Sequence, residues 1–205
     1  MDTDDIAVWT RCEQELKVFA RNPECAIVGT WVDEFEGETG NVVTVRTVPG
    51  NMKGIIKRMK VTNAFNHPSV MFRKEAVLKS GNYNTKCTAD EDYDLWYRMI
   101  INGYKAINIQ KSLVKFRLGK NFSKRRRTRQ AFQAKIGIKR KMYQDGFMNM
   151  FEYACTIALE YIYLYCPADI RKMLFNREKK RLEKVKEKHD YYKSAIPGKF
   201  LRGRQ

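Results

Sequence analysis

The sequence has little of the histidine and cysteine from which many metal and redox centres are built. It contains two histidines and five cysteines, and the cysteines form neither a Cys-x-x-Cys pair nor a cluster with histidine. These absences argue against a metal site that uses either residue type. We interpret the cysteines as buried, reduced thiols of a cytosolic protein.

The sequence also lacks the apolar segments that direct a protein into or across a membrane. The residues after Met1 are acidic, whereas a signal peptide begins with basic residues. The longest apolar stretch, residues 147–166, contains Glu152 and Glu160, and a membrane span needs about 20 uninterrupted apolar residues. At 205 residues without an internal repeat, the chain is long enough for one domain and a helical appendage.

Charges of the two signs are distributed unevenly along the chain. Residues 1–115 contain 16 Lys and Arg against 15 Asp and Glu, whereas residues 116–205 contain 24 against 8, a net charge of +16. The hydrophobic content of 43% and the aromatic content of 12% are too high for a disordered chain. A near-neutral globular part is thus followed by a basic part, which predicts contact with an anionic surface such as phospholipid, polyphosphate or nucleic acid.

The hydrophobic pattern predicts a mixed α/β domain that is followed by helices alone. Strands are expected at residues 26–32, 42–46, 69–73, 106–109 and 113–116, and the first two form a hairpin. Helices are expected at residues 5–22, 51–62 and 74–79, and then from a Thr88–Glu91 capping box to Gly103. Three further helices follow at residues 124–144, 147–166 and 170–189. We therefore divide the chain into a domain of residues 1–122, a basic helical extension of residues 123–189 and a loose tail of residues 190–205.

Three of these helices have a recognisable face. The first carries its apolar residues at near-helical spacing, which predicts that they face the core: Ile6, Trp9, Cys12, Leu16 and Phe19. The helix before Gly103 has four expected core residues: Leu95, Trp96, Met99 and Ile100. The stretch 147–166 is apolar apart from one polar stripe: Asn149, Glu152, Thr156 and Glu160.

Three aspartates stand at the start of the chain, namely Asp2, Asp4 and Asp5. Hard cations such as Mg²⁺ and Mn²⁺ prefer carboxylate oxygens and commonly keep water and substrate phosphate as further ligands. One or two carboxylates at a strand end are enough to hold such a cation against a diphosphate. The alternative is that these acids only cap the next helix and interact with its dipole, with Asp5 or Thr3 as the capping residue.

A second acidic cluster, Asp90-Glu91-Asp92-Tyr93-Asp94, lies at the start of the helix that ends before Gly103. Crowded carboxylates repel one another, which raises the pKa of at least one of them and makes it a candidate base for a hydroxyl group. The alternative is again that acids suit the N-terminus of a helix. Four acids within five residues are more than a helix cap requires.

A series of short motifs runs through residues 1–130: Asp2-Thr3-Asp4-Asp5-Ile6, Arg11 with Gln14, Ile27-Val28-Gly29-Thr30 with Val32 and Phe35, Phe65-Asn66-His67-Pro68-Ser69-Val70-Met71-Phe72-Arg73, Gly81-Asn82-Tyr83, Glu91-Asp92-Tyr93-Asp94-Leu95-Trp96 and Gly103-Tyr104. Their order and spacing resemble glycosyltransferase family 2. The resemblance implies a partial GT-A fold, which is a Rossmann-like mixed sheet. It also implies inverting transfer of a sugar from a nucleotide-sugar donor to a hydroxyl acceptor, in the synthesis of an envelope or capsule polysaccharide.

The resemblance further implies roles for individual residues. Asp4 would ligate the Mg²⁺ or Mn²⁺ ion that bridges the donor diphosphate, and Asp2 would bind towards the ribose or the donor sugar. Asp92 would be the base that deprotonates the acceptor hydroxyl, and Glu91 would shape the acceptor site. The acceptor would be lipid-linked or a saccharide.

Two further features of the sequence have more than one interpretation. His67 and Arg117 are candidate contacts to the acceptor or the diphosphate, but a turn histidine bound by the backbone and a solvated basic face that includes Lys124–Arg127 are the alternatives. The apolar helix at residues 147–166 either packs against protein or lies on the cytosolic face of a membrane. Its basic flanks and the tyrosines from Tyr143 onward suit the second position, as a peripheral protein on an anionic membrane surface.

In the family, the opening strand, the first nucleotide-binding loop and the acid that recognises the base all precede the Asp-x-Asp motif, whereas this sequence begins with that motif. We therefore expect a chain truncated at its N-terminus, with a sheet edge and apolar faces left open. Two other functions stay open: a non-catalytic remnant or interaction protein, and a nucleic-acid-binding protein. Only charge supports the latter, because no finger, RRM or homeodomain pattern is present.

Overall fold

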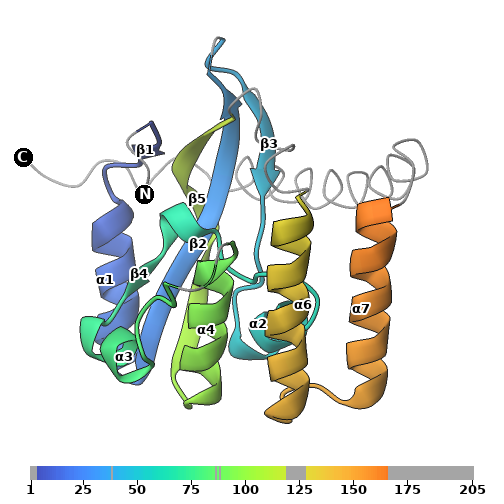
Figure 1. Cartoon of the computed structure of the whole chain (residues 1–205). Helices are drawn as coiled ribbons and strands as arrows, with labels where there is room; N and C mark the ends of the chain where they lie inside the picture. Colours follow the sequence, from blue (N-terminus) through green and yellow to red (C-terminus); the bar gives the residue numbers. More distant parts are fainter. Residues whose placement is uncertain (1–3, 38, 86, 88, 119–127, 166–205) are drawn as a thin grey trace, which may run out of the picture. The chain divides into compact units, whose positions relative to one another are not determined.

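The computed structural model describes residues 4–37, 39–85, 87, 89–118 and 128–165. They form a mixed five-stranded sheet with helices packed on it, followed by two further helices (Figure 1). This confirms the expected fold class. The chain divides into two compact units, residues 1–160 and 161–205. The expected boundary at residues 122/123, the helix at 170–189 and the tail lie outside the described residues and stay predictions.

Two parallel strands form the centre of the sheet, β2 (Cys25–Glu36) and β5 (Lys105–Leu118). The strand order is β1-β5-β2-β3, and β4 also pairs with β2. The remaining strands are short and antiparallel to their neighbours: β1 (Ile6–Ala7), β3 (Val42–Arg46) and β4 (Met71–Phe72). The β2–β3 hairpin is confirmed. The two strands expected within residues 106–116 are one continuous strand, because β5 follows β2 along its whole length with shifts of register near Trp31.

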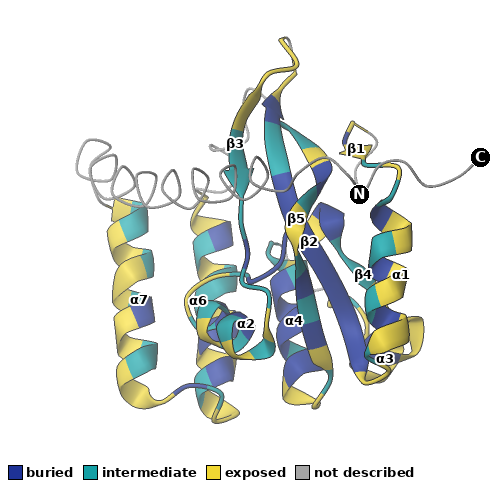
Figure 2. Ribbon diagram, turned by 180° about the vertical axis from the view of Figure 1, so that it is seen from behind, coloured by how far each residue is buried: buried dark blue, intermediate teal, exposed yellow. Residues whose placement is uncertain are grey.

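Helices cover both faces of this sheet, and the alternation of side chains along β2 explains which core each face contributes to. The helices are α1 (Arg11–Arg21), α2 (Met52–Met59), α3 (Lys74–Lys79), α4 (Glu91–Ile101), α6 (Arg129–Gln144) and α7 (Met150–Tyr165), with a 3-10 turn, η1 (His67–Ser69). Ile27 joins the main core with residues of α2, α4 and α6, whereas Val28 packs with Phe19 of α1. Strand β2 is buried over most of its length, whereas most residues of β5 are half-buried or exposed (Figure 2).

A close approach between the two central strands ties loops to the sheet. Gly29 on β2 faces Asn108 on β5, and a Cβ atom at Gly29 would overlap the Asn108 Oδ1 atom. The Asn108 Nδ2 group donates to the carbonyl oxygens of Pro49 at 2.8 Å and Ala64 at 3.0 Å. The absence of a side chain at Gly29 therefore leaves room for the residue that holds both segments flanking α2.

The predicted inward face of the first helix is confirmed at Phe19 and wrong at its other residues. Helix α1 begins at Arg11, after β1, and buries Arg11, Glu15 and Phe19. The Arg11 guanidinium lies 3.2 Å from the Glu15 carboxylate, so the two charges are buried as a pair. The expected core residues Trp9 and Leu16 are 90% and 58% exposed. The hydrophobic pattern counted the residues of β1 and the following turn as part of the helix, and its predicted face is therefore wrong there.

Helix α4 has the predicted core face but a different start. Its four expected core residues are all buried, and it ends before Gly103, which has a positive φ of 87°. The capping box would start the helix directly after Thr88, whereas α4 begins at Glu91 and follows Asp90, which is in the left-handed conformation.

The prediction of uniformly buried thiols is also wrong, because Cys12 and Cys155 are exposed.

Candidate functional site

The Asp92 carboxylate lies in the first turn of α4, where residues from two other segments meet it. The Asn63 Nδ2 group donates to Asp92 Oδ2 at 2.8 Å, and the His67 Nδ1 atom lies 3.2 Å from the same oxygen. The Asp92 side chain is 14% exposed and that of His67 is 45% exposed. Both contacts are made to one oxygen. No described residue forms a hydrogen bond to the other carboxylate oxygen, Oδ1. That oxygen can therefore accept a proton from a bound group.

The segments that carry Asn63 and His67 are fixed by further hydrogen bonds. The Asn63 Oδ1 atom accepts from the Phe65 backbone N–H at 3.0 Å, which directs the Asn63 amide donor to Asp92. In η1, the Ser69 hydroxyl donates to Thr30 O at 3.1 Å and also accepts from the Thr30 backbone N–H at 3.0 Å. His67 is thereby held beside the middle of β2.

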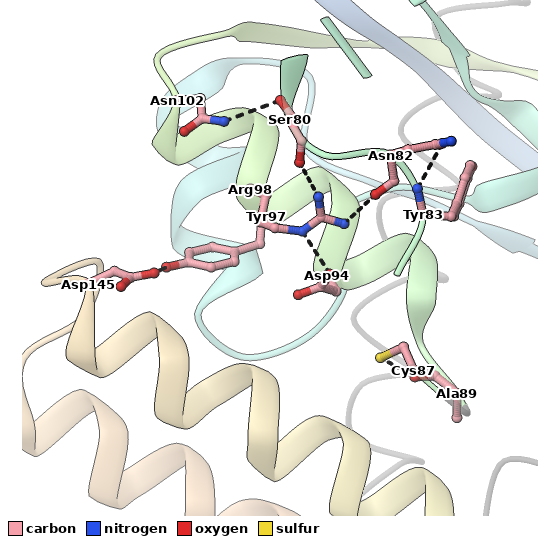
Figure 3. A network of polar contacts seen from close by, with 10 residues as sticks. All are labelled: Ser80, Asn82, Tyr83, Cys87, Ala89, Asp94, Tyr97, Arg98, Asn102 and Asp145. Atoms are coloured by element: carbon pink, nitrogen blue, oxygen red, sulfur yellow. Dashed lines mark hydrogen bonds and ion pairs between the residues drawn. The ribbon is translucent and has the colours of Figure 1, made fainter. Parts of the chain in front are cut away.

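Helix α4 is anchored at its other end by an arginine (Figure 3). The Arg98 Nε group donates to Asp94 Oδ2 at 2.8 Å, and the same guanidinium donates to the backbone carbonyls of Ser80 and Asn82. The Tyr97 hydroxyl donates to Asp145 Oδ2 at 2.6 Å, which joins α4 to the end of α6. The acidic cluster at the start of α4 is therefore not uniform: Asp94 binds Arg98, and Asp92 faces His67.

The pKa values of two side chains beside the cluster are raised. The hydrogen bond to Asp92 raises the pKa of His67 above its ordinary value of 6.5. The Tyr83 ring lies 6.3 Å from the His67 ring, and burial, followed by the Asp92 and Glu91 carboxylates, raises the pKa of Tyr83. The sequence predicted His67, Glu91 and Asp92 as site residues, and the structure brings them together. It adds Asn63 and Tyr83, which were not predicted as site residues.

A second group forms where the start of the chain meets the end of β5. The Arg117 backbone N–H donates to Asp5 Oδ1 at 3.2 Å, and the Arg117 Nε group donates to the Asp4 carbonyl at 3.3 Å. The guanidinium also donates to Gly37 O at 3.0 Å and lies 4.9 Å from the centre of the Phe35 ring. The alternative that Asp5 caps the next helix is wrong, because β1 lies between them and Thr10 precedes α1. Asp2 lies outside the described residues.

The Asp92 group and the Arg117 group lie at different positions along strand β2. His67 is held beside Thr30 of β2 through η1, whereas Arg117 stacks on Phe35 near the end of the same strand. Five residues of strand correspond to ~17 Å. The structure thus brings Asp92, Glu91 and His67 together, and separately Asp4, Asp5 and Arg117.

Beside Arg117 the structure offers a cation one exposed carboxylate, that of Asp4. Among the described residues, no group of three or more His, Cys, Asp and Glu side chains could hold a metal ion. Asp5 is 8% exposed and accepts from the backbone of β5, whereas Asp4 is exposed. A Mg²⁺ or Mn²⁺ ion at Asp4 would therefore take further oxygen ligands from phosphate and water, as these ions commonly do.

Comparison with known proteins finds relatives that are named as glycosyltransferases. An uncharacterised glycosyltransferase of Haemophilus influenzae is 31% identical over 85% of this chain and 64% of its own length. A UDP-Gal:alpha-D-GlcNAc-diphosphoundecaprenol beta-1,3-galactosyltransferase of Escherichia coli is 29% identical over 86% of this chain and 63% of its own. A glycosyltransferase of amylovoran biosynthesis from Erwinia amylovora is 28% identical over 88% and 66%. The chain thus spans less than two thirds of each relative's length, and no profile of a protein family matches it.

Proposed function

The chain is homologous to glycosyltransferases over most of its length, and we propose that it forms the acceptor side of an inverting site of the family 2 type. The reaction would transfer a sugar from a nucleotide-sugar donor to a hydroxyl group of a lipid-linked or saccharide acceptor in polysaccharide synthesis. The single observation that carries this proposal is the Asp92 carboxylate, held by Asn63 and His67 through one oxygen at the start of α4.

In the proposed mechanism, Asp92 acts as the general base. Its Oδ1 atom takes the proton of the acceptor hydroxyl while the hydroxyl oxygen attacks the anomeric carbon of the donor sugar. The new glycosidic bond forms as the bond from that carbon to the diphosphate oxygen breaks, and the nucleoside diphosphate leaves. Asn63 and His67 hold the carboxylate in place, which reduces the cost of orienting it. Glu91, which is exposed beside Asp92, would contact the acceptor.

The donor would lie on the side of Asp4 and Arg117. Asp4, with Asp2, would hold a Mg²⁺ or Mn²⁺ ion, which when bound supplies the positive charge that neutralises the leaving diphosphate. Arg117 lies against the Asp4 backbone and carries a fixed positive charge to the same place. The separation of ~17 Å along the strand leaves room for a diphosphate and a sugar between the two groups.

The named activity of the E. coli relative suggests the first substrates to test: a UDP-sugar as donor and a lipid-diphosphate-linked saccharide as acceptor. The test uses an extended protein that joins this chain to the part of the E. coli relative that it does not span. With UDP-galactose, Mn²⁺ and such an acceptor, Asp92→Asn in this protein should lower turnover by ~10²–10⁴-fold because it keeps the shape of the side chain and removes its basicity. The affinity for UDP should not change. Glu75→Gln, which alters an acid in the first turn of α3, is the matched control and should keep full turnover.

A binding measurement tests the donor side separately. Calorimetric titration of the extended protein with UDP should show Mn²⁺-dependent binding, and Asp4→Ala should abolish the dependence on the ion. The chain by itself should bind UDP weakly or not at all. Equal binding by the extended Asp4→Ala variant with and without Mn²⁺ would contradict the metal assignment. Full turnover by Asp92→Asn would contradict the base assignment, and an extended protein that binds UDP and transfers no sugar would favour the non-catalytic alternative.

A further inference from the structure

Helix α7 packs with its polar side towards the protein. The two oxygens of Glu152 each accept from Lys60 at 2.7 Å. Glu160 lies 3.6 Å from Lys139 and 4.0 Å from Lys135, both on α6, and Thr156 is 4% exposed. The polar stripe that the sequence predicted on this helix is therefore its inner face.

The opposite side of α7 is apolar and exposed. We define this outer face by residues 150, 151, 154, 155, 158 and 159, which are all the exposed residues of the helix up to Glu160. None of them is charged. Met150 is 68%, Phe151 78% and Leu159 51% exposed. Figure 2 shows α7 largely in the colour of exposed residues. A helix on a protein surface ordinarily has the reverse orientation, with its apolar stripe towards the core.

A continuous exposed apolar face marks a place where something else binds. The charge of the surrounding chain indicates which partner fits. Residues 116–205 contain 24 Lys and Arg against 8 Asp and Glu. Helix α6, which stands beside α7 in both views, has Arg129, Arg140 and Lys141 exposed (Figure 1). A second copy of the chain would bring the same positive charge to the interface, whereas an anionic surface is attracted by it.

An apolar helical face with basic residues around it is the pattern of a helix that lies in the interface of a bilayer. The 16 residues of α7 measure about 24 Å. No described helix has the length and apolar character to span a membrane. The sequence of α7 adds Tyr161, Tyr163 and Tyr165 at its end, and tyrosine is enriched at the level of lipid headgroups.

We propose that the outer face of α7 binds an anionic phospholipid surface, with its apolar side chains among the acyl chains and the basic residues of the chain against the headgroups. The inner carboxylates of Glu152 and Glu160 are turned away from the negative headgroups and neutralised by lysine. This orientation removes the two charges that would otherwise oppose binding.

Vesicle flotation with the full chain tests this proposal. Binding should occur to vesicles of phosphatidylcholine with phosphatidylglycerol and weaken with added salt, because exposed charges are then screened. Phe151→Asp should weaken binding at least tenfold, since it places a negative charge on the outer face. Ala158→Asp on the same face is the second variant and should act in the same direction. Leu16→Asp, at a similarly exposed leucine of α1, is the matched control and should bind as the wild type does.

Circular dichroism of each variant separates loss of binding from loss of folding. Equal vesicle binding by the wild type and both folded variants would overturn the proposal, because charge alone would then explain it. Absence of binding to anionic vesicles by the wild type would overturn it as well. A concentration-dependent dimer that Phe151→Asp abolishes, without any vesicle binding, would assign the face to a second copy.

Discussion

At the scale of single residues, the Asp92 carboxylate is coupled to the protonation of an imidazole. His67 lies 3.2 Å from Asp92 Oδ2. The hydrogen bond to Asp92 raises the pKa of His67, so the ring keeps its proton to a higher pH than an ordinary histidine does. The positive charge beside Asp92 is lost as pH rises through that raised value, and activity that depends on Asp92 should change over the same interval.

The titration of His67 is a direct test of this contact. Its pKa should lie above 6.5 in the folded chain because the hydrogen bond to Asp92 favours the imidazolium. Asp92→Asn should return it to 6.5 or below, since burial alone lowers it. The raised pKa means that the contact contributes stability that is fully present below the unfolded-state pKa and is lost as pH rises through the folded-state value. NMR titration of the His67 ring protons measures this pKa in the wild type and in Asp92→Asn. An unchanged pKa in the variant would contradict the contact.

The residues around Asp92 also show what a sequence can and cannot predict. Asp92 and Glu91 could be identified because their motif lies within one turn of a helix. Asn63 could not, because it is 29 residues from Asp92 and follows α2 in a segment without a motif. Tyr83 belongs to a recognised motif, but its position beside His67 depends on the Arg98 contacts that fold the Ser80–Asn82 segment onto α4.

At the scale of secondary structure elements, ion pairs are buried at two places where an apolar helix face is normally expected. Helix α1 buries Arg11 with Glu15, and the α6–α7 pair encloses Lys139 with Glu160. Hydrophobic periodicity assumes that charged residues face water. It therefore predicted the wrong face of α1, and it identified the polar stripe of α7 without showing that the stripe points inward. The spacing of four residues allows the Arg11–Glu15 pair but does not show that it is buried. The Lys139–Glu160 pair joins two helices and could not be derived from spacing.

The stability of the α6–α7 pair should depend on Glu160. Lys139 is 1% exposed, donates to Val61 O at 2.8 Å, and has its pKa lowered by burial. Glu160→Ala should lower the free energy of unfolding by about 3–5 kcal/mol, because it leaves a buried charge without its partner. Lys139→Met combined with Glu160→Leu should recover most of this loss. Urea denaturation monitored by circular dichroism measures the difference.

Glu13→Ala is the control for this experiment. Glu13 pairs with Lys17 on the exposed surface of α1, and such pairs contribute about 0–1 kcal/mol. Equal effects of Glu160→Ala and Glu13→Ala would show that the inner face of α7 does not depend on its ion pairs.

At the scale of the whole chain, the mixed sheet and the order of its elements could be predicted because strand and helix patterns are local. The distance that separates the Asp92 group from the Asp4 group could not be predicted from the sequence. Helix α4 has 11 residues and the following strand β5 has 14, but a helix advances about 1.5 Å per residue and a strand about 3.3 Å. The first turn of α4 therefore reaches only the middle of β5, whereas Arg117 lies near the end of that strand.

The cysteines within the described residues differ in chemical accessibility. Cys25 is fully buried, and burial raises the pKa of its thiol, whereas Cys12 and Cys155 are exposed. Alkylation with iodoacetamide at neutral pH should modify Cys12 and Cys155 before Cys25, because reaction requires an accessible thiolate. Peptide mass spectrometry at successive times measures the order. Alkylation of Cys25 at the same rate would contradict its burial in the sheet.

The position of Cys155 within the outer face of α7 has a practical consequence for handling the protein. In a preparation stored without reductant, air oxidation can join two chains through this thiol. Such a covalent dimer would hold the two apolar helices against each other. The adsorption of the protein to detergent micelles and plastic surfaces would then depend on how far the sample has been oxidised. A freshly reduced sample and an oxidised sample of the same sequence would therefore differ in this property.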